Sequence, residues 1–224
     1  MRIIFIRHGD PDYEKDSLTE KGWREAALLA ERVARWKVTD FYVSPLGRAQ
    51  DTASLSLKKA GRKAQTLSWL REFHAPVNDP VRGESVIPWD FYPGFWTKEE
   101  GMYDRNAFAD TAVMRSGPVK EEFARVCTGL DELLARYGYV REGGIYRTDL
   151  SDKTQRDAVI VLFCHMGITL YLCGHLLGIS PVVLTAGFFL APTSVTVLAS
   201  EEREEGSAYF RCQAAGDTAH LLMG

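Results

Sequence analysis

The amino-terminal stretch Met1-Arg-Ile-Ile-Phe-Ile-Arg-His-Gly-Asp10 decides how the rest of the chain is organised. Its apolar run, Ile3 to Ile6, is typical of a short strand buried in a parallel sheet. The run stops abruptly in Arg7-His8-Gly9. Ligands of open α/β sheets bind at the carboxyl ends of the strands. The stretch therefore predicts that a cation and an imidazole lie at the ligand-binding edge of a sheet.

The three residues that end this strand have complementary chemistry. The guanidinium of Arg7 offers a planar fork of donors that suits a phosphate group. The imidazole of His8 can act as a nucleophile or a base near neutral pH. Gly9 allows a sharp turn or the close approach of a ligand. Alternatively, the tripeptide is an ordinary strand-end turn with a solvated arginine.

A second strand ends in the same way. Residues 158–164, Ala-Val-Ile-Val-Leu-Phe-Cys, form the most apolar strand pattern in the chain, and His165-Met-Gly167 follows before a helix that we expect from Ile168 to about Leu177. Two histidines at two strand ends are more informative than one. Cys164, beside His165, is an alternative nucleophile, although a buried cysteine is also ordinary at the end of an apolar strand.

A further arginine is expected at the start of a helix. Residues 38–43 favour a strand, and Ser44-Pro45 then opens a helix that ends at Gly61. Arg48 therefore lies near a helix N-terminus, where the dipole and the free N–H groups favour anions and disfavour cations. An anion nearby would offset this conflict. The alternative is a solvent-exposed arginine.

Glu72 is the candidate acid. It follows a short strand predicted at residues 63–67, within Ser68-Trp-Leu-Arg-Glu-Phe-His74. The alternative for Glu72 is a surface carboxylate paired with Arg71 or Lys63, and we interpret His74 as a loop residue.

Two amphipathic helices and one irregular segment complete the pattern. We expect helices from Lys21 to about Trp36, with Trp23 in its apolar stripe, and from Val119 to Tyr137. Between them, residues 75–118 contain five of the nine prolines and many aromatic residues. This composition favours an insertion of loops and short helices that caps the sheet edge as a lid or specificity wall. The aromatic residues could equally form a homodimer contact.

Composition narrows the class of protein. The chain has 224 residues, 46% hydrophobic and 25% charged, and a net charge of −3. These values fit a single domain over residues 1–224, with an insertion at about 75–118. The absence of a basic block argues against nucleic acid as a partner. No apolar run has membrane-spanning length, and the four cysteines lack zinc spacing, so we expect a cytoplasmic protein with no membrane partner and no bound metal.

Four motifs together carry a family resemblance. Arg7-His8-Gly9, Leu18-Thr-Glu-Lys-Gly22, Ser44-Pro-Leu-Gly-Arg48-Ala49 and Cys164-His165-Met-Gly resemble the histidine phosphatase superfamily, in its phosphoglycerate-mutase-like branch. Their order and spacing agree with that family from residue 1 to about 200. The resemblance implies an α/β three-layer sandwich with a mostly parallel central sheet and helices on both faces. It also implies that the final hairpin, near residues 193–212, supplies strands at the sheet edge.

The resemblance also implies a role for each candidate residue. His8 would be the nucleophile that becomes phosphohistidine. Arg7, Arg48 and His165 would bind the phosphoryl oxygens. Glu72 would protonate the leaving group and then activate water. No cofactor is implied.

Some residues depart from the mutase pattern. Mutases of the family usually have Glu after Arg-His-Gly and a Trp-Asn pair a few residues later, whereas here Asp10 and Tyr13-Glu14 occupy these positions. We therefore expect a metal-independent phosphomonoester hydrolase, of the histidine acid type, acting on a small phosphorylated metabolite or a phosphoprotein. A phosphoglycerate-type mutase and a catalytically silent phosphate-binding regulatory protein are the alternatives.

Overall fold

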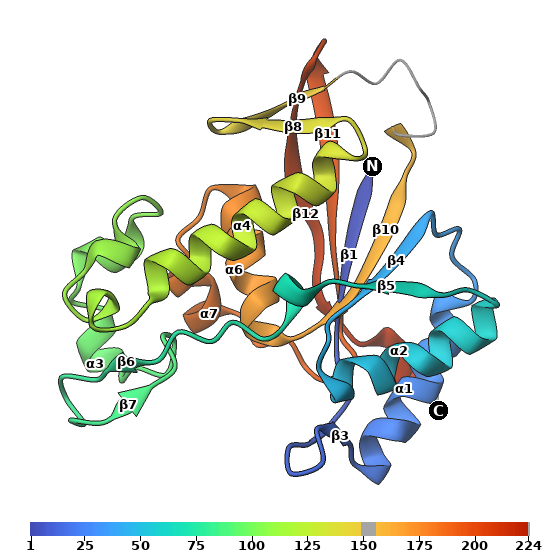
Figure 1. Ribbon diagram of the computed structural model, residues 1–224, viewed down its shortest axis with the longest axis horizontal. Helices are drawn as coiled ribbons and strands as arrows, with labels where there is room; N and C mark the ends of the chain where they lie inside the picture. The colour runs from blue at the N-terminus through green and yellow to red at the C-terminus, as the bar shows by residue number, and fades with distance from the viewer. Residues whose placement is uncertain (149–155, 224) are drawn as a thin grey trace.

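One mixed sheet organises the molecule (Figure 1). The structure is a computed structural model that describes residues 1–148 and 156–223. Among these residues, eight strands form the sheet in the order β5-β4-β10-β1-β11-β12-β9-β8. The strands are β1 (Arg2–Arg7), β4 (Asp40–Val43), β5 (Ala64–Thr66), β8 (Tyr139–Glu142), β9 (Ile145–Thr148), β10 (Val159–Cys164), β11 (Val195–Glu204) and β12 (Ser207–Asp217).

The pairing of the strands corrects two predictions. Only the neighbours among β5, β4, β10 and β1 pair in parallel, whereas the pairings from β1 through β11, β12 and β9 to β8 are antiparallel. The sheet is therefore not mostly parallel. The final hairpin, β11–β12, lies inside the sheet next to β1, and the described edges are β5 and β8. The reason is local, because tight turns at Gly143 and Gly206, both with positive φ, force antiparallel hairpins.

Helices cover both faces, as predicted. They are α1 (Glu20–Val33), α2 (Gly47–Ala60), α3 (Pro93–Trp96), α4 (Val119–Ala135), α6 (Met166–Leu177) and α7 (Pro181–Gly187). Side chains alternate along β1. Ile4 and Ile6 join the core under α1 and α2, while Ile3 and Phe5 join the core under α4 and α6. Because both faces of β1 are buried, its residues Ile3 to Ile6 are all apolar and do not alternate with polar residues.

The first helix buries a different face from the one predicted. Thr19 is its N-cap, and the Thr19 hydroxyl accepts a hydrogen bond from the Gly22 N–H. Trp23, predicted to face the core, is exposed, whereas Glu25 is buried. The carboxylate of Glu25 accepts a hydrogen bond from the backbone N–H of Asp10 at 3.0 Å. This hydrogen bond to the loop after β1 places the Glu25 carboxylate on the inner face of α1, and Trp23 lies on the outer face.

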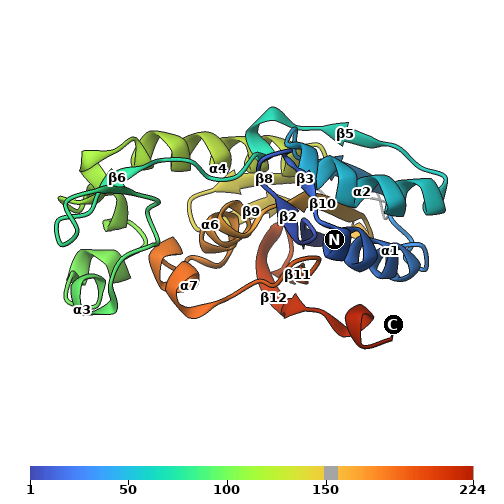
Figure 2. The ribbon, with the colours of Figure 1, turned by 90° about the horizontal axis from the view of Figure 1, so that it is seen from below.

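Residues 75–118 form irregular structure at one end of the molecule. They contain β6 (Val77–Asn78), β7 (Ser85–Val86), α3 and three 3-10 turns, η2 (Glu100–Tyr103), η3 (Phe108–Asp110) and η4 (Met114–Ser116). Figures 1 and 2 show this segment beside α7 and the beginning of α4, away from α1 and α2. The remaining short elements are β2 (Pro11–Asp12), β3 (Ser17–Leu18), η1 (Ser68–Leu70) and η5 (Ala219–Met223). No helix in the described part of the chain is long and apolar enough to span a membrane.

The loop after β1 packs backbone to backbone on the start of α1. A Cβ added to Gly22 would lie 2.3 Å from the Asp10 carbonyl oxygen. We expect Gly22→Ala to lower the free energy of unfolding by about 1–3 kcal/mol, because the contact is with backbone that cannot move aside. Gly144→Ala, at a glycine with nothing within 4 Å, should change it little. Denaturant titration of both variants checks this, and equal stabilities would contradict the close packing.

Candidate functional site

The end of β1 presents His8 as a neutral imidazole. The side chain is only 2% exposed. Its Nδ1 lies 2.7 Å from the carbonyl oxygen of Gly9, which can only accept, so Nδ1 carries the proton and Nε2 keeps a lone pair. Burial lowers the pKa of His8 to about 4, and the charges of Arg7 and Arg48 act in the same direction. At neutral pH, Nε2 is therefore available as a nucleophile.

The second strand-end histidine lies against the first. The ring centroids of His8 and His165 are 5.1 Å apart. His165 is fully buried, and its Nε2 lies 2.8 Å from the hydroxyl of Ser44. The hydroxyl of Ser44 also accepts a hydrogen bond from the Leu46 N–H, and its own proton can be donated to Nε2 of His165. In that arrangement the single N–H proton of the neutral His165 ring lies on Nδ1, which is buried and has no partner among the described residues. Burial holds the pKa of His165 well below its usual value.

Arg7, the last residue of β1, is held by a backbone carbonyl at one end of its guanidinium. One terminal nitrogen, Nη1, donates to the Leu190 carbonyl at 2.5 Å, while Nε is buried without a partner among the described residues. Burial lowers the pKa of Arg7, and the nearby Tyr13 and Glu72 partly offset this. The guanidinium still stays charged at neutral pH, since an arginine pKa lies so far above it.

Arg48 is held by a carboxylate that the sequence did not single out. Its Nη1 lies 2.6 Å from Oδ1 of Asp16, and the second oxygen of Asp16 accepts the Gly47 N–H at 2.7 Å. Asp16 is thus the anion predicted at the start of α2. Burial alone would raise its pKa, but the hydrogen bonds from Gly47 and Arg48 outweigh burial and lower it. The Nε of Arg48 is buried and unpartnered among the described residues.

Glu72 is an interior carboxyl group and not a surface ion pair. It accepts hydrogen bonds from the backbone N–H groups of Phe73, Gly167 and Ile168, at 2.8, 3.3 and 2.8 Å. The last two belong to the first turn of α6, directly after His165. Burial raises the pKa of Glu72 even though these three donors oppose the shift. Glu72 is thereby suited to carry a proton that a surface glutamate would have lost.

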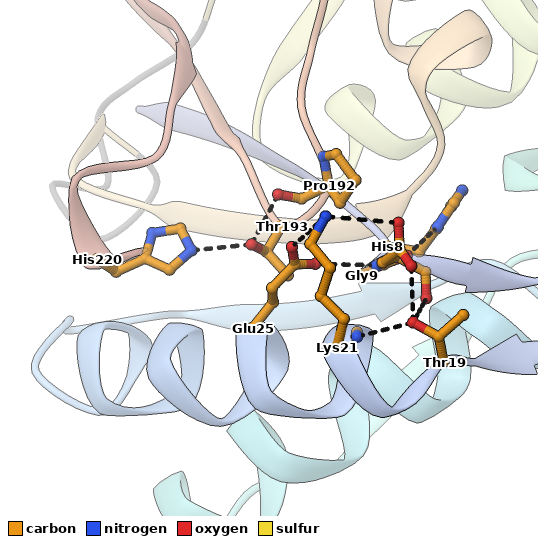
Figure 3. A network of polar contacts seen from close by, with 10 residues as sticks. His8, Gly9, Thr19, Lys21, Glu25, Pro192, Thr193 and His220 are labelled. Carbon is orange, nitrogen blue, oxygen red and sulfur yellow. Dashed lines mark hydrogen bonds and ion pairs between the residues drawn. The ribbon is translucent and has the colours of Figure 1, made fainter. Parts of the chain in front are cut away.

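The backbone around His8 is fixed from both sides, and Figure 3 shows Thr193 and His220 on one of them. The His8 carbonyl accepts from the N–H of Thr193, whose hydroxyl lies 3.0 Å from Nε2 of His220. Thr193 has φ 58°, a left-handed conformation that is rare for threonine. On the other side, the hydroxyl of Thr52 accepts the Gly9 N–H at 2.9 Å. His220 therefore helps to hold the Thr193 side of this backbone.

The five residues predicted from the sequence come together. Arg7 and Arg48 both act on the pKa values of His8 and His165, and Arg7 also lies near Glu72. Cys164 is a poor alternative nucleophile, because burial raises its pKa to about 12. The described residues contain no group of three or more His, Cys, Asp or Glu side chains placed to hold a metal ion. Sequence reasoning missed three positioning groups, Asp16, Ser44 and Thr193.

Replacing Asp16 tests whether it positions Arg48. We expect Asp16→Asn to lower kcat/KM for a phosphate ester by about tenfold, because a neutral amide holds a guanidinium less firmly than a carboxylate does. Inorganic phosphate should also inhibit the variant more weakly. A matched control is Asp12→Asn, since Asp12 pairs with the exposed Lys15 in the same loop. Unchanged phosphate inhibition in the Asp16 variant would show that Arg48 is positioned without it.

The His165 imidazole and the guanidiniums of Arg7 and Arg48 lie near the His8 ring, a set of groups that can bind an anion beside a nucleophilic nitrogen. Residues 3–84 match the sequence model of the histidine phosphatase superfamily, branch 1. Within the curated proteins, the probable phosphoglycerate mutase GpmB of Yersinia enterocolitica is 33% identical over 97 residues. That match covers 39% of this chain and 45% of the relative. The amino-terminal third of the chain therefore resembles the histidine phosphatase superfamily, and the chain spans less than half the length of the curated relative that it matches.

Solved structures agree with this fold over nearly the whole chain. A mycobacterial glucosyl-3-phosphoglycerate phosphatase has a TM-score of 0.65 at 22% identity, covering 96% of this chain and 98% of that one. A phosphoserine phosphatase from Entamoeba histolytica has a TM-score of 0.60 at 20% identity, covering 98% of both chains. At such identities the likeness shows the shared fold alone.

Proposed function

We propose that this protein is a phosphomonoester hydrolase that acts through a phosphohistidine at His8. One observation carries the proposal. Among the described residues, four buried side-chain nitrogens lack a partner, and three of them belong to Arg7, Arg48 and His165, which lie near His8. An unpartnered buried polar group costs about 1–3 kcal/mol. The oxygens of a phosphoryl group would accept hydrogen bonds from all three.

The chemistry follows from the positions of these groups. Nε2 of His8 attacks phosphorus, and the bond between phosphorus and the ester oxygen breaks. The carboxyl proton of Glu72 passes to the departing oxygen. Arg7, Arg48 and His165 bind the equatorial oxygens and neutralise their charge in the transition state. Water then attacks the phosphohistidine while the Glu72 carboxylate takes its proton, which releases phosphate and restores both residues.

The substrate we propose is a small phosphorylated metabolite or a phosphoprotein. A phosphoglycerate mutase is the rival proposal, because the similar curated proteins are probable phosphoglycerate mutases. Independence of metal ions, a cytoplasmic location and a homodimer stay predictions.

The experiment measures phosphate release from an aryl phosphate, glycerol phosphate and 3-phosphoglycerate, each with and without a chelator. Release that survives the chelator supports the proposal. Interconversion of phosphoglycerates without net phosphate release would replace hydrolase with mutase. Stabilisation by inorganic phosphate with no turnover of any ester would identify a binding protein instead.

The pKa shifts of His8 and Glu72 predict a bell-shaped dependence of kcat/KM on pH. His8 must be unprotonated, so kcat/KM should rise with pH through about 4. Glu72 must be protonated, so kcat/KM should fall above the raised pKa of Glu72. The ratio of the Glu72→Gln rate to the wild-type rate cancels the ionisation of the substrate, and this ratio should increase with pH. A ratio that does not change with pH would remove Glu72 as the titrating acid.

A further inference from the structure

An exposed aromatic ring packs against the guanidinium of each of the two arginines, Arg7 and Arg48. The guanidinium carbon of Arg7 lies 5.6 Å from the ring centre of Phe189, and that of Arg48 lies 5.4 Å from the ring centre of Tyr13. The two rings come from different segments, the chain after α7 and the loop between β2 and β3. Tyr13 also acts on the pKa of Arg7, so it lies near both arginines.

These rings are unusually open to solvent. Phe189 is 74% exposed and Tyr13 is 68% exposed. Attraction between a guanidinium and one ring face stabilises the position of each ring, but it leaves most of the ring surface exposed to water. Exposed apolar surface gathered at one place typically marks a binding surface. Here that place is the position of the two phosphate-binding guanidiniums.

A third ring lies beside the proton donor. A Cβ added to Gly167 would lie 2.4 Å from the ring of Trp89 and 2.8 Å from Oε1 of Glu72, so ring and carboxyl meet over this glycine. Trp89 is half-buried and packs near Phe73 and Tyr171. This tryptophan belongs to the segment 75–118. It therefore brings an aromatic wall to the group that protonates the leaving oxygen.

We propose that this site selects phosphomonoesters whose alcohol carries an aromatic or comparably flat apolar group. The inference rests on the proposed function. With the phosphoryl group between Arg7 and Arg48, the alcohol part leaves from the side of Glu72 and meets the rings of Trp89, Phe189 and Tyr13. Burial of a flat apolar group against such rings favours binding, whereas a polyhydroxy alcohol gains little from the same contact.

The test compares two primary alkyl esters whose leaving groups have similar basicity, 2-phenylethyl phosphate and glycerol 1-phosphate. We expect the wild type to prefer the phenylethyl ester by about tenfold or more in kcat/KM. In Phe189→Ala the ratio should fall toward one. Tyr92→Ala is the matched control, since Tyr92 is also an exposed ring that lies over an arginine, Arg82, within the segment 75–118. It should leave the ratio unchanged.

The outcomes distinguish a wrong substrate class from a wrong proposed function. Equal kcat/KM for the two esters, or a preference for glycerol 1-phosphate, would overturn the substrate class and leave the hydrolase standing. Equal losses on both esters in Phe189→Ala would show that Phe189 only positions Arg7, which also overturns it. No phosphate released from any ester, with the protein folded, would instead reject the proposed function itself.

Discussion

Replacing His8 by alanine should lower kcat/KM for any phosphate ester by at least about 10⁴-fold, because the variant has no nucleophile to accept the phosphoryl group. The fold should survive. Among the described residues, the ring of His8 donates only to the carbonyl of its neighbour Gly9, and the backbone contacts to Thr193 and Cys164 do not depend on the side chain. Measurement of phosphate release and of thermal unfolding on the same preparation checks both parts.

His74→Ala serves as the histidine control for this experiment. His74 is an exposed loop residue, and its replacement should leave kcat/KM within about twofold, as is usual for a surface change. A folded His8→Ala variant that retains a tenth of wild-type activity would refute covalent catalysis at this position.

The second large effect is expected for Glu72→Gln, and it should depend on the leaving group. For an alkyl phosphate, the departing alkoxide needs a proton, so the loss should be about 10²–10⁴-fold in kcat/KM, which reports the phosphoryl-transfer step and not the later hydrolysis of the phosphohistidine. For an aryl phosphate with a weakly basic phenoxide, the loss in kcat/KM should be much smaller. Both values come from one phosphate-release assay with esters well below KM.

Glu25→Gln is the matched control for Glu72→Gln. Glu25 is another interior carboxylate, and it also accepts a backbone N–H, that of Asp10. Its replacement can disturb the loop after β1, but it should lower alkyl and aryl rates by the same factor. An equal loss on both ester types in Glu72→Gln would mean that Glu72 orients the first turn of α6 and transfers no proton.

Local patterns in the sequence predicted the parts of the site that end a strand or begin a helix. An apolar run that stops in Arg7-His8-Gly9, and a second run that stops before His165, place both imidazoles without knowledge of the sheet. Arg48 in the first turn of α2 indicated a missing anion. That signal could have led to Asp16, although nothing local shows that its carboxylate reaches the N–H of Gly47.

Long-range pairing was beyond such patterns. The family resemblance implied edge strands for the hairpin β11–β12, yet β11 pairs with β1 at the centre of the sheet. Register and strand order depend on which strands meet in space, and the sequence of one strand does not determine this. The same limit applies to Phe189, whose place over Arg7 follows from the path of the chain after α7.

The central claim is a phosphoryl group on His8, and trapping that intermediate tests it most directly. The protein is mixed with an ester labelled in its phosphoryl group, denatured within milliseconds in alkali, and digested for mass spectrometry. The account predicts a label that is stable in alkali, labile in acid and located on His8. A label on another residue, or active protein that never becomes labelled, would contradict it.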